Sequence, residues 1–508
     1  MNHLKSIHVE NIVKKVLILL FFATGFSLPW ENAMGQTLES LLFPKDNFTV
    51  ETKIVKTSTG EKKVTYHSYQ HITYVAKPVD KDFQSLNVSV PVEIDGKAID
   101  AKNAPIFFDI AVGGYMSVRN NNSSVVATGG GATGGRGGGA GNASSVSGRP
   151  DLALAAGFVI VSPGCRGRDN KAADGTYYGK APAAIVDLKA AVRYIRYNKG
   201  VIPGNTDRII SVGCSAGGAL SALLGASGNS SLYDSYLKEI GAADVPDNIY
   251  ASACYSPITD LEHADGAYEW NYGTIPVKTA LVDQKLSEQL RTLNAEYQES
   301  LMLKGKNGFG IILADNYDKY LMKYYLLPSA DMFLKGLTVE KRTEYLSNNK
   351  WLTWSDKGPS FAFADYVTHV GRMKSLPAFD AFEMNQPEPN LFGNKTTDNR
   401  HFTNFSLQQT TGNKSAMIES EVKTIVNLMN AMYFIGLKNE GCAPNWWLRN
   451  GTSDNHTSQT VMVNLATSLE NQSKNVNALV FWDGGHCADY DPEGLITWMS
   501  IVAGYTKQ

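Results

Sequence analysis

The 508-residue chain has no excess of charge of either sign. Lysine and arginine together number 47, and aspartate and glutamate number 49, so the formal net charge is only -2. Nucleic-acid-binding domains typically concentrate basic residues on one face. The balance therefore argues against a nucleic-acid partner. Apolar residues make up 43% of the chain and charged residues 19%, which is the composition of an ordinary folded protein and not of a disordered one.

A hydrophobic run long enough to span a membrane is missing from the N-terminal region, although a shorter run is present there. Val16–Leu28 is apolar over thirteen residues, which is short for a membrane-spanning helix. Two lysines precede it, and small residues occupy the third and first positions before Gln36. This pattern is typical of a signal peptide. We expect residues 1–35 to be removed, which leaves a secreted or periplasmic protein without membrane attachment; the alternative is an uncleaved anchor.

Cysteine is scarce, and a dinucleotide fingerprint in its proper setting is absent. The chain has five cysteines, and their odd number leaves at least one thiol free. Gly129, Gly131 and Gly134 match the G-x-G-x-x-G pattern, but no clear strand precedes them and more glycines follow where a helix should begin. We interpret Thr128–Gly141 as a flexible loop, and we expect neither a cofactor nor a metal.

Apart from these absences, the chain shows strands that alternate with helices. This order predicts an α/β fold with a mainly parallel sheet and helices on both faces. Antiparallel strands are expected first, near Val64–Val75 and Leu86–Ile94. The expected later strands are Ala104–Ala111, Gly157–Val161, Arg208–Cys214, Ile249–Ile258, Trp446–Asn450 and Val476–Trp482. The expected helices are Ala181–Lys199, one from Ala216, Ala416–Ile435, Thr460–Ser468 and Pro492–Ala503.

The alternation stops between residues 259 and 414. This stretch is rich in tyrosine, tryptophan, lysine and proline, and it contains helix-like patches such as Val282–Gln298. The chain is also too long for one compact core. We therefore predict a core formed by residues 36–258 and 415–508, with an inserted cap at 259–414.

The segment RIISVGCSAGGALSALL, Arg208–Leu224, contains the clearest chemical signal. A β-branched run leads into Gly213-Cys214-Ser215-Ala216-Gly217, and an alanine- and leucine-rich helix follows. This is G-x-S-x-G in its strand–turn–helix setting, the nucleophile elbow of α/β hydrolases. Ser215 is the predicted nucleophile; the alternative is a glycine-rich turn with an incidental serine.

A serine nucleophile requires a base and an orienting acid. In this fold the histidine follows the last strand, and His486 has that position; His456, in the preceding crossover, is the one rival among the nine histidines. Asp454 follows the preceding strand and is the expected acid. Asp483 and Asp489 are nearer to His486 in sequence, but we interpret them as loop-capping groups.

Two further features belong to the same predicted site. The oxyanion hole should use the backbone N–H of Ala216 and one from Gly113 or Gly114, which follow an expected strand. Cys214 precedes the serine and Cys487 follows the histidine, so a Ser215–His486 hydrogen bond brings the two thiols within bridging range. Export permits a disulfide there; the alternative is two unrelated buried cysteines.

The chain resembles the tannases over most of its mature length. Among bacterial tannases the similarity lies in Gly164–Asn170 (GCRGRDN), Ala173–Lys180 (ADGTYYGK) and Gly213–Ser230 (GCSAGGALSALLGASGNS). The cysteine–serine, aspartate and histidine–cysteine arrangement is also similar to that of fungal tannases and feruloyl esterases, in which the two cysteines are bridged. The resemblance implies an α/β-hydrolase fold with a cap and hydrolysis of galloyl esters, with a small phenolic ester as the partner molecule.

The resemblance also implies a site for the galloyl ring. In bacterial tannases a cap lysine, a cap glutamate and an aspartate two residues after the catalytic acid hold the ring hydroxyls. Lys374 and Glu388 match the first two by position, whereas His456 stands at the third. From sequence alone, the two cap residues could equally be ordinary surface charges. The alternative functions are a feruloyl or general aromatic carboxylesterase and, outside enzymes, a hydrolase-like surface binding protein.

Overall fold

The computed structural model describes residues 40–120 and 148–506. The signal peptide expected at residues 1–35 and the glycine-rich loop at 128–141 lie outside these ranges. Within the described part of the chain, none of the helices has the length and apolar character that a membrane crossing requires.

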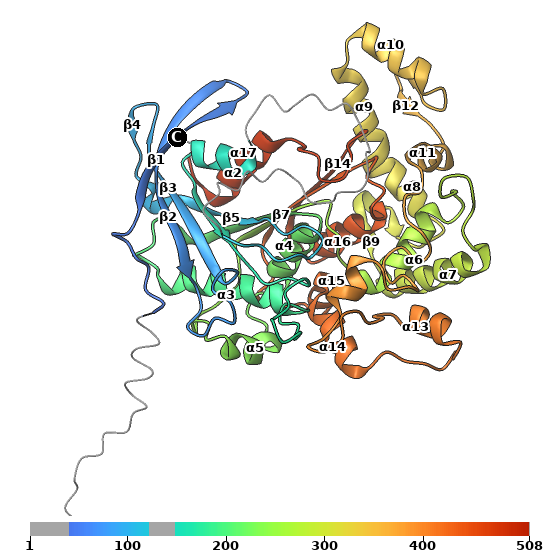
Figure 1. Cartoon of the computed structure of the whole chain (residues 1–508). Helices are drawn as coiled ribbons and strands as arrows, with labels where there is room; N and C mark the ends of the chain where they lie inside the picture. The colour runs from blue at the N-terminus through green and yellow to red at the C-terminus, as the bar shows by residue number, and fades with distance from the viewer. Residues whose placement is uncertain (1–39, 121–147, 507–508) are drawn as a thin grey trace, which may run out of the picture. The chain divides into compact units, whose positions relative to one another are not determined.

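A ten-stranded sheet organises the fold, in the order β1-β2-β3-β6-β5-β7-β8-β13-β14, with β4 paired to β3 (Figure 1). Neighbours from β6 to β14 are parallel, whereas β1, β2 and β3 are antiparallel and β3 joins β6 antiparallel. The mainly parallel sheet is confirmed. Its strands are β1 Thr49–Thr57, β2 Gly60–Thr73, β3 Ser85–Ile94, β4 Lys97–Ala98, β5 Pro105–Ile110, β6 Val159–Pro163, β7 Asn205–Cys214, β8 Ala251–Tyr255, β13 Asn445–Gly451 and β14 Asn475–Phe481.

Helices cover both faces of the sheet. In Figure 1, α2 and α17 lie on one face, and α3, α4 and α5 lie on the other. The strands alternate their apolar side chains between these faces, so each face has its own hydrophobic cluster. The helices are α2 Arg149–Ala155, α3 Ala183–Tyr197, α4 Ala216–Ala226, α5 Asp234–Glu239, α14 Ser420–Leu428, α15 Ala431–Gly436, α16 Gln459–Asn471 and α17 Pro492–Ala503.

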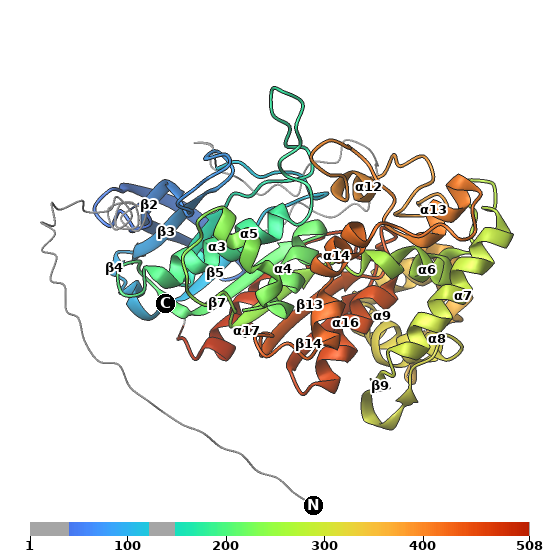
Figure 2. The same ribbon diagram turned by 90° about the horizontal axis from the view of Figure 1, so that it is seen from below.

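A long helical segment lies between β8 and β13; we call residues 261–411 the helical insertion. It gathers at the β14 end of the sheet (Figure 1), and α6 and α7 pack side by side within it (Figure 2). Its helices are α6 Leu261–Tyr272, α7 Gln284–Ser300, α8 Tyr317–Leu321, α9 Leu327–Gly336, α10 Val339–Asn348, α11 Phe363–Val370, α12 Pro387–Leu391 and α13 Asn404–Thr411. Its strand pairs are β9 Lys304–Gly305 with β10 Gly310–Ile311 and β11 Thr353–Ser355 with β12 Gly358–Ser360.

The structure corrects one expected helix. Ala416–Ile435 is not continuous but divides into α14 and α15. The break lies at Asn430, whose backbone is extended and whose side chain accepts the N–H of Met432 as the cap of α15. The same amide donates to Asp260 at 2.8 Å. The tertiary contact and the cap together outweigh the helical periodicity of this stretch.

The segment before β2 also differs from the sequence expectation. β1 forms a hairpin with β2, although no strand was predicted there. Its sequence TVETKIVKT alternates polar and apolar side chains only weakly, and most of its residues are exposed or half-buried. An edge strand with so little burial carries a weak sequence signal.

Candidate active site

Ser215 lies on a tight turn at the carboxyl end of β7. Its backbone has φ 58° and ψ -123°, a strained conformation for a residue with a side chain. A Cβ at Gly213 would collide with the carbonyl of Gly217, and one at Gly217 would lie 2.7 Å from the carbonyl oxygen of Ile110. Both glycines are therefore required by close backbone approach, and the turn exposes the serine hydroxyl at the end of the sheet.

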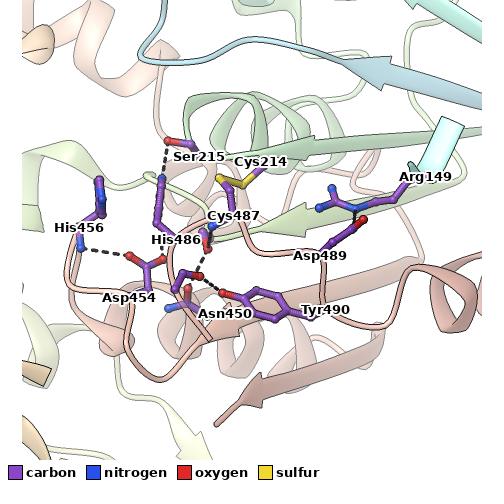
Figure 3. The surroundings of a disulfide bond; sticks show 12 residues. Arg149, Cys214, Ser215, Asn450, Asp454, His456, His486, Cys487, Asp489 and Tyr490 are labelled. Atoms are coloured by element: carbon purple, nitrogen blue, oxygen red, sulfur yellow. Dashed lines mark hydrogen bonds and ion pairs between the residues drawn. A yellow bond between two sulfur atoms is a disulfide. The ribbon is translucent and has the colours of Figure 1, made fainter. Parts of the chain in front are cut away.

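Ser215, His486 and Asp454 form a continuous hydrogen-bond chain (Figure 3). Nε2 of His486 lies 2.9 Å from Oγ of Ser215, and Nδ1 lies 2.9 Å from Oδ2 of Asp454. The aspartate follows β13 and the histidine follows β14, as the strand order predicts. Burial opposes ionisation of Asp454, yet the adjacent His486 keeps the pKa of this carboxyl below its ordinary value. The arrangement suits proton transfer from the serine to the imidazole.

The two other acids near His486 in sequence have different partners. Asp483 accepts the hydroxyl of Tyr345 and lies 3.6 Å from Nε2 of His369. Asp489 pairs with Nε of Arg149 at 2.9 Å (Figure 3). Among the described residues, Asp454 is thus the one carboxylate bonded to the His486 ring.

A disulfide joins the serine turn to the histidine loop. Cys214 and Cys487 are bonded, with their Cα atoms 5.8 Å apart (Figure 3). The N–H of Cys487 donates to Oγ of Ser256 at 3.2 Å, and this hydroxyl donates to Oδ1 of Asn450 at 3.1 Å. The ends of four parallel strands are therefore tied together around the hydrogen-bond chain. The remaining cysteines, Cys165, Cys254 and Cys442, are buried and free.

The groups expected to form an oxyanion hole lie beside the serine turn. The N–H of Gly217 donates to the carbonyl of Val112 at 2.9 Å, which brings the loop after β5 against the start of α4. Gly114 has φ 53°, and its carbonyl accepts Nε of Arg168 at 2.7 Å. Within the described residues, the N–H groups of Gly113, Gly114 and Ala216 have no acceptor. They are available to a negatively charged oxygen.

Lys374, which is half-buried, and Glu388, which is buried, both belong to the helical insertion. Burial lowers the pKa of Lys374 and raises that of Glu388, while the attraction between the two charges opposes both shifts. Nζ of Lys374 lies 3.6 Å from the ring centre of Phe379. Glu388 is only 5% exposed, and its Oε2 has no hydrogen-bond partner among the described residues. A ligand hydroxyl would supply the partner that this buried oxygen lacks.

His456 lies directly against the hydrogen-bond chain. Its backbone N–H donates to Oδ1 of Asp454 at 3.1 Å, and its ring stacks on that of His486, with centres 4.0 Å apart and planes 12° apart. Burial, together with the neighbouring His486, lowers the pKa of His456 to about 4. The imidazole is therefore neutral near pH 7, with one nitrogen able to donate and the other to accept.

Two residues that the sequence did not single out also support the site. Arg168 lies in the GCRGRDN stretch, and besides Gly114 it contacts Oδ1 of Asn390 at 3.0 Å. Tyr268, on α6, hydrogen-bonds the backbone of Lys374 and of Asn455. The GCRGRDN motif marked the segment that contains Arg168 but did not indicate the role of this residue. A tyrosine in a helix, such as Tyr268, gives no signal in the sequence.

Comparison with known proteins places this geometry in a family. The BD-FAE family model matches residues 123–300. The tannase of Fusobacterium nucleatum has 34% identity and a TM-score of 0.77, covering 91% of this chain and 99% of that chain. The tannin acyl hydrolase of Lactobacillus plantarum has 30% identity and a TM-score of 0.76, with the same coverage of both chains.

A structure of a tannin acyl hydrolase with 3,4-dihydroxybenzoate also matches at 30% identity and a TM-score of 0.77, and another contains ethyl gallate. Among curated proteins there is no match to this chain.

Proposed function

Because the chain belongs to the tannase family and is a carboxylic ester hydrolase, we propose that it hydrolyses galloyl esters through a Ser215–His486–Asp454 triad. The observation that carries the proposal is the position of His486, which bonds both Ser215 and Asp454 at 2.9 Å. One nitrogen of this imidazole faces the nucleophile while the other is fixed by a buried carboxylate, as general-base catalysis requires.

The first half of the reaction forms an acyl-enzyme. Oγ of Ser215 attacks the ester carbonyl while Nε2 of His486 takes the hydroxyl proton. The carbonyl oxygen becomes an oxyanion, which the N–H groups of Ala216 and of Gly113 or Gly114 stabilise. The tetrahedral intermediate then collapses, the ester bond breaks, and His486 returns its proton to the departing alcohol. The galloyl group remains bonded to Ser215.

The second half releases the acid. A water molecule gives a proton to His486 and attacks the acyl carbonyl, and the same N–H groups stabilise the second oxyanion. The bond to Oγ breaks, the serine recovers its proton from His486, and gallic acid leaves. Asp454 stays ionised throughout. It orients the imidazole and stabilises its charged form, and it does not take the proton itself.

We assign recognition of the phenolic ring to Lys374, Glu388 and His456. The unpartnered Oε2 of Glu388 can accept one ring hydroxyl, and Nζ of Lys374 can donate to a neighbouring one. The neutral imidazole of His456 can bond the third, on the side of the ring nearest the triad. An ester without these hydroxyls leaves the buried Glu388 and the half-buried Lys374 and His456 without those partners and is a poorer substrate.

We further propose that the enzyme works outside the cytoplasm. The Cys214–Cys487 disulfide supports an oxidising compartment, and the sequence of residues 1–35 supports export. The expected location is the periplasm or the external medium.

The test compares methyl gallate, methyl ferulate and methyl benzoate as substrates of the purified protein and its variants. We expect Ser215→Ala to lower kcat by about 10³-fold or more on every ester. Lys374→Ala and Glu388→Ala should each remove about 1.5–3 kcal/mol of transition-state binding for methyl gallate, with a much smaller effect on methyl benzoate.

Lys341→Ala, at an exposed position of α10, is the matched control for loss of a lysine in the helical insertion. Near-normal activity of Ser215→Ala would overturn the serine mechanism. Equal losses on gallate and benzoate esters would show that Lys374 and Glu388 do not bind ring hydroxyls. A wild-type preference for methyl ferulate would replace galloyl esters by hydroxycinnamoyl esters as the substrate class.

A further inference from the structure

Helix α6 is the first helix of the helical insertion, and it starts close to the nucleophile. The chain reaches it from β8 through Ile258, whose N–H donates to the carbonyl of Ser215 at 3.2 Å and whose carbonyl accepts the hydroxyl of Tyr115 at 2.8 Å. The base of α6 is therefore attached to the serine turn. A loop that is bonded to α6 therefore has a fixed position relative to the serine turn.

Along α6, successive turns hold the loop that carries Lys374. Asp265 accepts the N–H groups of Phe379 and Asp380 at 2.7 and 3.1 Å. One turn later, Glu269 forms a fully buried ion pair with Arg372. The guanidinium of Arg372 also donates to the carbonyl of Lys374 at 2.8 Å. The backbone around Lys374 is thus bound to the helix on both sides.

Tyr268 connects this loop with the triad. Its hydroxyl accepts the N–H of Met373 at 3.2 Å and the N–H of Lys374 at 3.0 Å. The same hydroxyl donates to the carbonyl of Asn455 at 3.0 Å. Asn455 lies between Asp454 and His456, so one buried oxygen touches both the backbone of the ring-binding lysine and the loop of the catalytic acid.

A second link joins the same two loops without the tyrosine. Nδ2 of Asn455 donates to the carbonyl of Gly371 at 3.2 Å. Gly371 precedes Arg372 and Lys374 in the chain. The link therefore holds the loop that carries Lys374 against the loop that carries Asp454, at a point before Lys374. The two loops are 80 residues or more apart in sequence and are held together by these side chains.

We propose that Tyr268 is a positioning residue that sets the distance between the ring-binding Lys374 and the Ser215–His486–Asp454 triad, and thereby determines preference for hydroxylated aromatic esters. The inference rests on the proposed function, because Lys374 must bind the ring for its placement to matter. Tyr268 does not itself touch the reacting atoms. It acts by placing the ester carbonyl over Ser215 when the ring hydroxyls are bound.

Tyr268→Phe is the decisive variant, since it removes the shared hydroxyl and keeps the ring. Tyr272→Phe is its matched control: Tyr272 lies one turn further along α6, and its ring centre is 4.8 Å from that of Tyr268. The hydroxyl that bonds Met373, Lys374 and Asn455 is that of Tyr268, not that of Tyr272. We expect Tyr268→Phe to lower kcat/KM for methyl gallate by about tenfold or more, because small displacements of bound substrate are costly. Its effect on methyl benzoate should be much smaller, and Tyr272→Phe should retain the wild-type preference.

The Lys374→Ala background separates positioning from a general structural role. If Tyr268 acts through Lys374, then adding Tyr268→Phe to Lys374→Ala should lower activity on methyl gallate no more than on methyl benzoate. A purely structural defect would instead lower gallate hydrolysis equally in both backgrounds. Thermal unfolding of each variant identifies any that does not fold. If Tyr268→Phe does not fold, Asn455→Ala, which breaks the second link, takes its place. We expect it to lower activity on methyl gallate more than on methyl benzoate.

The outcomes distinguish the inference from the function on which it rests. If the wild-type enzyme does not prefer methyl gallate to methyl benzoate, the proposed function fails and the inference fails with it. If the wild type has that preference but Tyr268→Phe, or Asn455→Ala in its place, preserves it, only the inference is overturned. Equal losses on both esters overturn it as well.

Discussion

At the scale of single residues, His456 is the feature that departs from the expected tannase pattern. Its ring is stacked on His486, the proposed base, at 4.0 Å. A second charged imidazole at that distance would repel the imidazolium that His486 becomes in the proposed mechanism. The lowered pKa of His456 removes this conflict, because the ring is neutral whenever His486 takes up a proton near pH 7.

The same lowered pKa predicts how stability changes with pH. The pKa of His456 falls from its ordinary 6.5 to about 4 on folding. Between these values the unfolded chain binds a proton that the folded chain does not, so folding becomes less favourable as the pH falls. We expect His456→Gln to lose less stability than the wild type between pH 7 and pH 5.

Thermal midpoints measured at the two pH values provide the check, and His71→Gln, at an exposed position in β2, controls for the loss of a histidine as such. Identical losses in the wild type and His456→Gln would contradict the prediction.

At the scale of elements, the site depends on the approach of two turns, one after β7 and one after β14. The disulfide joins them covalently, and the hydrogen bond from His486 to Ser215 crosses between them. Both turns are also held by the strands that precede them, so the disulfide is not the sole attachment. Loss of the disulfide should therefore disturb the geometry of the site before it unfolds the protein.

Reduction should separate these two effects. We expect a reducing agent to lower esterase activity before tryptophan fluorescence reports unfolding, since loss of the bridge costs about 2–4 kcal/mol without removing the packed core. The variant Cys214→Ser/Cys487→Ser should behave like the reduced enzyme. Cys442→Ser, which changes a buried free thiol, serves as the comparison. Parallel loss of activity and fluorescence would contradict this prediction, as would full activity in the reduced enzyme.

The core elements could be predicted because their signals are local, and the contacts that join Ser215, His486 and Asp454 could be predicted as well. The elbow motif and each apolar strand lie within a few residues of chain, and α17 has its predicted bounds, Pro492–Ala503. The order of serine, acid and histidine spans 271 residues, and it could be expected because the elbow identifies a fold in which that order is known. The role of Tyr268 and the break at Asn430 could not be predicted in this way. Tyr268 contacts a carbonyl 187 residues away, and Asn430 bonds an aspartate 170 residues away. Such contacts leave no periodic pattern in the sequence.

At the scale of the whole molecule, one hydrophobic cluster runs from the sheet into the helical insertion. It includes Leu223 and Trp446 beside the sheet together with Tyr317, Leu326 and Phe402 in the insertion, all at most 1% exposed. Among the residues that the structure describes, the insertion therefore shares its core with the sheet and has no separate one. Elements that share a packed core lose their contacts together when either of them opens.

Calorimetry can test whether the sheet and the helical insertion unfold together. We expect residues 41–506 to unfold in one cooperative transition, with the calorimetric enthalpy equal to the van't Hoff enthalpy. Limited proteolysis below the transition should leave the insertion uncut. Two resolved transitions, or release of a stable core fragment after cleavage within residues 261–411, would show that the insertion folds independently.

The spacing of the proposed triad along the chain also governs when activity through it can arise. The ribosome makes Ser215 first and His486 271 residues later, a delay of roughly 14–54 s at ordinary rates of translation. Throughout that interval the nascent chain carries the proposed nucleophile without the proposed base that would activate it. Under the proposed mechanism, ester cleavage can therefore begin only after the histidine loop that follows β14 has been synthesised, so an unfinished chain does not attack esters in the cell that makes it.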